Sequence, residues 1–158
     1  MTKLDALIDY KQLVEALADA VIVADLSGAM RFWNPAAERL FGFTEAEALG
    51  NSLDLIVPER FRDRHWAGYK STMDTGHTRY AHDVLRVPAV HKDGRPLSIA
   101  FTVGLLHGPQ GNVTGILAVI RDETARFAED RNLRKRLAEL EQRERINTTE
   151  APTGKLSG

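Results

Sequence analysis

Hydrophobic and polar residues are arranged in several distinct patterns along this chain, and each pattern predicts an element. Between Leu4 and Ala18 the apolar residues recur every three or four positions, which predicts an amphipathic helix. The apolar run 20–25 stops at a Ser27-Gly28 turn, and residues 30–33 follow with alternating character. These two segments predict a β-hairpin near the start of the chain.

Short helices are predicted after this hairpin. A proline at the first helical position and a glycine just past the last one predict a helix over Pro35–Phe41. Thr44 and Glu47 have the spacing of a capping box, in which the threonine accepts from the helix backbone and the glutamate reaches back. A longer helix is predicted over Glu59–Asp74, with a glycine two residues later as its stop signal.

The next part of the chain is rich in β-branched residues and predicts three strands, Val84–Val90, Leu97–Leu106 and Val113–Ile120. Glycine-containing turns over 92–95 and 108–112 separate them. With the opening pair, these strands form a five-stranded antiparallel sheet. Because the short helices fall between the second and third strands, we expect an α+β fold with the sheet on one side and the helices on the other.

Charged residues dominate the chain from Glu123 onward. Phe127, Leu133, Leu137 and Leu140 are spaced roughly as in a coiled coil, so the helix predicted here either pairs with a copy of itself or caps the sheet. The last residues are mostly polar or small and predict a disordered tail. The expected organisation is an N-terminal flanking helix (1–18), a core domain (19–122), a C-terminal signalling and dimerisation helix (123–147) and a tail (148–158).

Composition narrows the function classes. The chain has 158 residues, a formal net charge of -1 and no cysteine. Absence of cysteine excludes a disulfide scaffold, a zinc ribbon, a thiol nucleophile, an iron–sulfur cluster and a cysteinyl-flavin adduct. A near-neutral charge argues against general binding of nucleic acid.

The sequence carries no targeting or enzymatic signature. No segment approaches the roughly 20 apolar residues of a transmembrane helix, and the first residues lack the pattern of a signal peptide. We therefore expect a soluble, cytoplasmic protein without a membrane partner. Neither a phosphate-binding loop nor a nucleophile elbow is present, so we expect that the protein is not an enzyme.

Several short motifs, taken in order, resemble the PAS family of sensory domains over about residues 10–125. The motifs are Ala20–Asp25, Gly28, Phe32–Ala37, Leu40–Gly42, Gly50, Leu55-Ile56, Pro58, His91–Gly94, and Gly115 followed by Arg121–Thr124. The resemblance implies a PAS fold, a five-stranded antiparallel sheet whose helices enclose a small-molecule pocket. It also implies that Asn34 fastens its turn by side-chain bonds to the backbone.

The resemblance implies that a change in the pocket reaches an output domain through the flanking helices. No kinase, cyclase or helix-turn-helix segment lies in this sequence. We therefore expect a sensor whose output domain is separate or missing, and which forms a homodimer through its flanking helices.

The segment from Pro58 to His65, followed by Tyr69, is similar to the haem-binding helix of FixL-type oxygen sensors, in which the matching histidine is the axial ligand of haem iron. The similarity implies haem b, with His65 as metal ligand, for sensing oxygen, carbon monoxide, nitric oxide or redox state. Where those sensors carry an arginine that responds to bound oxygen, this chain has Leu85. The expected pocket residues are Tyr69 and Met73 on the helix, and Tyr80, Leu85, Phe101, Val103 and either Ile116 or Val119 on the opposite side.

Other interpretations stay open. His65 is equally explained as a core histidine bonded to a backbone carbonyl, and the pocket could hold another small organic ligand. A haem-free protein–protein dimerisation module is a further alternative, and non-covalent flavin also stays open, although no motif in the sequence supports it. His77, His82 and His91 lack a recognised metal-ligand spacing, so we interpret them as solvated turn residues.

Overall fold

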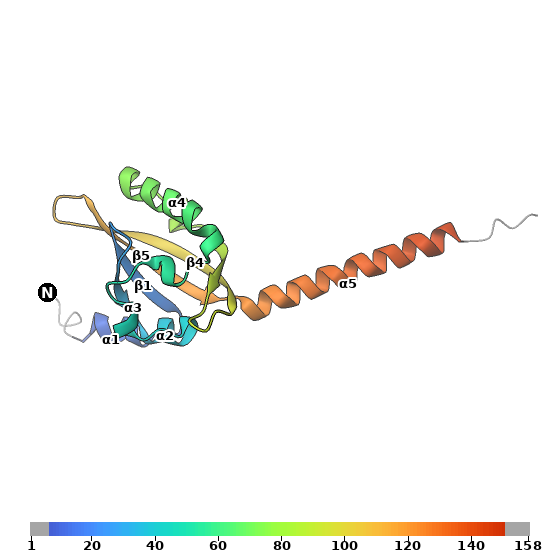
Figure 1. The fold of residues 1–158 in the computed structure, drawn as a ribbon, viewed down its shortest axis with the longest axis horizontal. Helices are drawn as coiled ribbons and strands as arrows, with labels where there is room; N and C mark the ends of the chain where they lie inside the picture. The colour runs from blue at the N-terminus through green and yellow to red at the C-terminus, as the bar shows by residue number, and fades with distance from the viewer. Residues whose placement is uncertain (1–6, 151–158) are drawn as a thin grey trace, which may run out of the picture. The chain divides into compact units, whose positions relative to one another are not determined.

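One antiparallel sheet organises the larger part of the chain. The structure is a computed structural model that describes residues 7–150, and the chain divides into two compact units, residues 1–123 and 124–158. The first unit contains the sheet and its helices, and the second contains the single helix α5 (Figure 1). The elements are α1 (Tyr10–Glu15), β1 (Ala20–Asp25), β2 (Met30–Trp33), α2 (Pro35–Phe41), α3 (Glu45–Ala48), η1 (Leu53–Leu55), η2 (Glu59–Phe61), α4 (Arg62–Thr75), η3 (Arg79–Ala81), β3 (Leu85–Val90), β4 (Pro96–His107), β5 (Val113–Asp122) and α5 (Thr124–Thr149).

The sheet has five antiparallel strands in the order β2-β1-β5-β4-β3, which confirms the predicted α+β fold. The β1–β2 hairpin and the three consecutive strands β3, β4 and β5 are joined by a pairing between β1 and β5, the first and last strands. Because successive residues of a strand face opposite sides, the register assigns each residue to one face. One row across the sheet, for example, joins Leu85, Phe101, Ile120 and Ala20.

The hydrophobic core lies between one face of this sheet and the helices. Trp33 and Phe41 are both almost fully buried, and their ring centroids lie 5.5 Å apart, so the pair joins β2 to α2. Figure 1 shows α4 lying apart from α2 and α3. The buried residues of the core cluster are Ala20, Ile22, Ala24, Met30, Trp33, Ala37, Phe41, Ala48, Leu53, Ile56, Tyr69, Ala89, Leu97, Ile99 and Ile120.

Asn34 is the buried polar residue of this core, with 1% of its surface exposed. Its Oδ1 atom accepts from the backbone N–H of Val21 at 2.9 Å and from that of Ala37 at 3.0 Å. Its amide group donates to the carbonyl oxygens of Val14 and Asp19, both at 3.1 Å. One side chain therefore caps α2 and fastens the end of α1 to the start of β1, which confirms the role that the family resemblance implied for Asn34.

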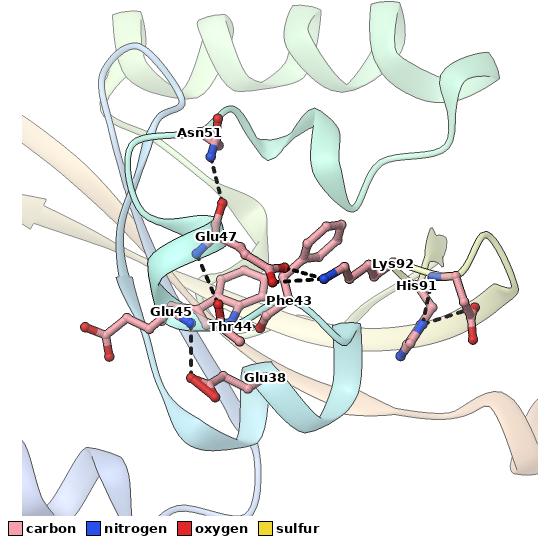
Figure 2. Close-up of polar contacts among 10 residues, drawn as sticks. Glu38, Phe43, Thr44, Glu45, Glu47, Asn51, His91 and Lys92 are labelled. Carbon is pink, nitrogen blue, oxygen red and sulfur yellow. Dashed lines mark hydrogen bonds and ion pairs between the residues drawn. The ribbon is translucent and has the colours of Figure 1, made fainter.

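The β3–β4 turn is attached to α3 and to the end of α2. Figure 2 shows Lys92 reaching Glu47, whose two carboxylate oxygens accept from the Lys92 ammonium at 2.9 and 2.8 Å. The predicted capping box is therefore only half right. Thr44 caps α3 by accepting from the Glu47 N–H at 3.2 Å, but the Glu47 carboxylate forms the charge-assisted pair with Lys92.

Two helix predictions need correction. The N-terminal helix extends over Tyr10–Glu15, where Asp9 caps it by accepting from two backbone N–H groups; the predicted start at Leu4 lies outside the described residues. The helix predicted over Glu59–Asp74 is divided into the 3-10 turn η2 and the helix α4, which ends at Gly76 in a left-handed conformation as predicted. A proline directly before Glu59 cannot donate a backbone hydrogen bond, and a tight turn follows it.

The second unit, taken by itself, is a helix without buried residues. Phe127, Leu133, Leu137 and Leu140 are each more than half exposed. The helix includes Thr148 and Thr149, whose hydroxyls bond to carbonyls one turn earlier, and the rest of the predicted tail lies outside the described residues. No helix within residues 7–150 is long and apolar enough to cross a membrane.

Candidate functional site

The helix α4 carries His65, the predicted metal ligand, and is held at its start by Arg62. The Arg62 guanidinium donates to the carbonyl oxygens of Val57 and Asp54, both at 3.2 Å. These bonds connect the first turn of α4 to η1 and to the loop that follows it. Apolar and aromatic side chains of α4 then face the core at helical spacing, since Trp66, Tyr69 and Met73 all pack on the core cluster.

His65 is half-buried on this helix. Its ring lies edge-on to Trp66, with ring centroids 4.8 Å apart, and 5.9 Å from Tyr69. Within the described chain its Nδ1 atom is buried and has no hydrogen-bond partner. Burial lowers the pKa of His65 below its ordinary value, and the nearby Asp54 carboxylate opposes this shift. The imidazole is therefore neutral at physiological pH, the form that binds a metal.

Trp66 anchors the first half of α4 to the β1–β2 turn. Its indole N–H donates to the Asp54 carboxylate at 2.8 Å, and its ring lies directly on Gly28. A Cβ atom at Gly28 would come within 2.1 Å of the Trp66 ring, and the backbone φ of this glycine is +83°. Glycine is therefore required at position 28 for the contact as well as for the turn.

Tyr69 forms a second anchor one turn later. Its hydroxyl donates to the backbone carbonyl of Asp25, at the end of β1. Burial raises the pKa of Tyr69 to about 12, and the negative charge of Asp25 contributes to the increase. We predicted Tyr69 as a pocket residue, and its hydroxyl in addition positions α4 against the sheet.

A cleft of about 790 Å³ opens beside these anchors. The second half of α4 forms one side, and the β1–β2 and β4–β5 turns form the other. The cleft brings together two of the predicted site residues, Tyr69 and Met73, whereas His65 does not line it. Its lining residues are Leu26, Ser27, Trp66, Tyr69, Lys70, Met73, Asp74, Thr75, Gly76, Gly111, Asn112 and Val113.

The strand residues of the predicted pocket share the core-facing side of the sheet. Leu85 pairs with Phe101, and Val103 and Ile116 belong to adjacent rows of the same face. Phe101 and Ile116 pack against the core cluster. The alternative Val119 is wrong, because it is an odd number of residues from Ile116 and pairs with residues of the opposite face.

The remaining candidates lie away from this face or in turns. Tyr80 is half-buried in η3, and Arg86 lies on the opposite side of the sheet from Leu85. His77 and His82 are exposed, but the prediction of a solvated turn residue is wrong for His91. The His91 ring covers Gly42, and its Nδ1 atom accepts from the Asp93 N–H at 3.1 Å. Residues 7–150 contain no group of three or more acidic or histidine side chains that could hold a metal ion.

Sequence reasoning missed the residues that position α4. Asp54 holds Trp66 and lies 3.8 Å from the Arg62 guanidinium, and Gly28 supports the indole. The sequence showed Gly28 as a turn residue, yet nothing in the pattern indicated which side chain would cover it. Only the three-dimensional arrangement connects positions 28, 54 and 66.

The residues present fit a haem group by their chemistry. A neutral imidazole is an iron ligand, and the buried, unpartnered nitrogen of His65 is a polar atom that the described protein leaves unsatisfied. Leu85, Phe101, Val103 and Ile116 together provide an apolar face suited to a porphyrin. Bound haem would supply an iron atom that coordinates a diatomic gas.

The fold defines a class, an α+β domain in which short helices cover one face of a five-stranded antiparallel sheet. A family model described as "PAS fold" matches residues 8–122. The chain therefore belongs to the PAS family, as its motifs predicted.

Relatives and solved structures agree with this assignment. The chain is 37% identical over 67 residues to the sensor protein FixL of Bradyrhizobium diazoefficiens, a match that covers 40% of this chain and 13% of FixL. It is 26% identical over 125 residues to the oxygen sensor protein DosP of Escherichia coli, covering 79% of this chain and 15% of DosP. The crystal structure of a PAS domain from Colwellia psychrerythraea superposes with a TM-score of 0.64 at 22% identity, covering 73% of this chain and 94% of that one. The chain thus spans less than a sixth of the length of these two curated relatives.

Proposed function

We propose that this PAS domain is a haem-based sensor of a diatomic gas or of redox state, with His65 as the protein ligand to the iron. The observation that supports the proposal is the half-buried His65 imidazole, neutral and with a buried nitrogen that no described residue satisfies. Similarity to FixL and to the oxygen sensor protein DosP supports the same assignment. A sensory rather than a catalytic role is consistent with the family, and we place the domain in the cytoplasm.

In this proposal, the residues around His65 bind and orient the cofactor. Trp66 and Tyr69 fix the position of α4, so the imidazole is presented from a held helix. Met73 and Tyr80 would complete the helix side of the pocket, and the apolar strand face would form the other side. Because Leu85, Phe101 and Val103 carry no hydrogen-bond donor, bound gas would meet an apolar wall.

A change at the pocket has a short covalent route to the C-terminal helix. Strand β5, which carries Ile116, continues into α5 through Glu123. At the end of β5 the Arg121 guanidinium binds Asp19 in two contacts of 3.2 and 3.1 Å. This pair ties the strand end to the residue just before β1. We propose that α5 passes the signal to an output domain on a separate chain or in another part of the protein.

A second candidate is a sensor of a small organic ligand, favoured by the cleft beside α4. Lys70 and Asp74, one helical turn apart on its rim, make no ion pair or hydrogen bond within the described part of the chain. Trp66 and Met73 offer it an apolar surface. Such a cleft suits an amphipathic ligand with charged groups, whose binding would not depend on His65.

Titration with haemin separates the two candidates. The purified chain is expected to bind one haem with a sharp Soret band and to quench the fluorescence of Trp66, measured in a Trp33→Phe background. His65→Ala should lose the band, while His82→Ala, which removes an exposed histidine, should keep it. Equal haem binding by wild type and His65→Ala would contradict the assignment of the ligand. Absence of a Soret band in the wild type, with quenching of Trp66 by organic acids or amines instead, would support the second candidate.

A further inference from the structure

The cleft beside α4 contains a cation and an anion on one side of the helix. Lys70 and Asp74 both line the cleft, and both are exposed. They are one helical turn apart, a spacing at which two side chains of a helix are neighbours. Within the part of the chain that the structure describes, neither makes an ion pair or a hydrogen bond. Both charges are therefore available to a molecule in the cleft.

The rest of the cleft offers such a molecule an apolar surface. Met73, three residues after Lys70, packs against the core cluster and lines the cleft from α4. Leu26 lines it from the β1–β2 turn, where its side chain is 55% exposed although polar residues are usual in turns. Val113 lines it from the start of β5. An apolar group bound here would contact three segments of the chain.

The walls of the cleft are held by hydrogen bonds that need no ligand. Trp66 donates to the Asp54 carboxylate, and Tyr69 donates to the backbone carbonyl of Asp25, so this side of α4 is fixed. Across the cleft, the Asp25 carboxylate accepts from the backbone N–H of Ser27 at 2.9 Å and shapes the β1–β2 turn. A ligand would therefore not have to order the walls in order to bind.

The spacing of the two charges selects a class of ligand. The Cβ atoms of residues one turn apart on a helix are about 5–6 Å from each other. An α-amino acid carries an ammonium and a carboxylate group on one carbon atom, so it can reach Lys70 and Asp74 at the same time. A simple acid or a simple amine would pair with one of the two charges only. The apolar surface then suits an aliphatic or aromatic side chain.

We propose that the cleft is a second ligand site of this domain, separate from His65, and that it binds a free α-amino acid with an apolar side chain. The Lys70 ammonium donates to the ligand carboxylate, and the Asp74 carboxylate accepts from the ligand ammonium. The ligand side chain packs on Leu26 and Met73. The inference deepens the second candidate function and rests on it in taking the cleft as a binding site. It does not rest on haem, because His65 does not line the cleft.

Isothermal titration calorimetry of the full, haem-free chain tests the ligand class. L-Leucine or L-phenylalanine should bind at one molecule per chain. The matched analogues are 4-methylpentanoate and 3-phenylpropanoate, which lack the amine, and 3-methylbutylamine and 2-phenylethylamine, which lack the carboxylate. Each should bind at least about tenfold more weakly than its parent, because a charge-assisted hydrogen bond is lost. Absence of binding by both amino acids, or equal binding of an amino acid and its analogues, would overturn the proposal.

Two substitutions assign each charge to its partner. Asp74→Asn should weaken binding of the amino acid about tenfold and abolish its advantage over the analogue without the amine. Lys70→Gln should in the same way abolish its advantage over the analogue without the carboxylate. Asp63→Asn is the matched control, because it removes an exposed carboxylate of the same helix outside the cleft, and should change neither preference. Preferences that survive in Asp74→Asn and Lys70→Gln would refute the assigned contacts.

His65→Ala separates this inference from the proposed haem function. The variant should bind the amino acid as the wild type does, and loss of binding would contradict a separate site. Quenching of Trp66 by other organic acids or amines, without binding of either amino acid, would retain the second candidate function and overturn the present inference. Failure of the haem titration would alter none of these expected results.

Discussion

Replacement of Asn34 by alanine is the perturbation whose cost follows most directly from the structure. The side chain makes four hydrogen bonds, and 1% of its surface is exposed. Alanine removes the N-cap of α2, which costs about 1 kcal/mol. It also leaves the buried N–H of Val21 without its partner, at about 1–3 kcal/mol. The carbonyls of Val14 and Asp19 lose their donor as well.

Together these terms predict that Asn34→Ala lowers the free energy of unfolding by about 3–5 kcal/mol. The free energy of unfolding of a whole domain is about 5–15 kcal/mol, so the variant should fold but lose much of its stability. Urea unfolding followed by tryptophan fluorescence measures the change, and the midpoint should fall by about 2 M.

Asn51→Ala is the matched control. The Asn51 amide also donates to a backbone carbonyl, that of Glu47 at 2.7 Å, but at an exposed position where water can replace it. We expect a loss of less than about 1 kcal/mol. Equal destabilisation by the two substitutions, or a loss below about 1 kcal/mol for Asn34→Ala, would refute the reasoning from burial.

Three further predictions concern α4 and the pocket. Gly28→Ala should cost about 2–4 kcal/mol in urea unfolding, from the positive φ and the clash with Trp66, whereas Gly111→Ala, with a φ of +79° and open space, should cost about 1 kcal/mol. Burial lowers the pKa of His65, so the contribution of the neutral imidazole to the free energy of unfolding should be complete above pH 6.5 and decline as the pH falls below that value. His65→Gln should lack this decline when unfolding midpoints are measured against pH. Haem-loaded protein should bind carbon monoxide firmly and oxygen weakly in gas titrations, and Leu85→Arg, by adding a charged donor, should raise oxygen affinity about tenfold or more.

Much of the fold could be predicted because its signals are local. Pro35 and Gly42 delimit α2 by their own backbone preferences, and the turns at 92–95 and 108–112 fix which strands are neighbours. The boundary at Phe61 could not be predicted in the same way. At this boundary Arg62 donates to the carbonyls of Val57 and Asp54, contacts that no periodicity encodes.

The site was less predictable than the fold for the same reason. Alternation along β4 and β5 assigns Phe101, Val103 and Ile116 to one face once the register is known, and the register also excludes Val119. The contacts of Trp66 with Gly28 and Asp54 join three segments far apart in the chain. The contact that Glu47 makes is likewise set by the tertiary structure, because its carboxylate pairs with Lys92 instead of making the local capping contact.

The assignment of His65 as the iron ligand is tested most directly by chemical rescue. In His65→Gly the missing ring leaves space that free imidazole can occupy. We predict that this variant binds haem without the wild-type Soret band, and that added imidazole restores the wild-type spectrum at one haem per chain. His82→Gly should need no rescue. A wild-type spectrum in His65→Gly without imidazole would contradict the account.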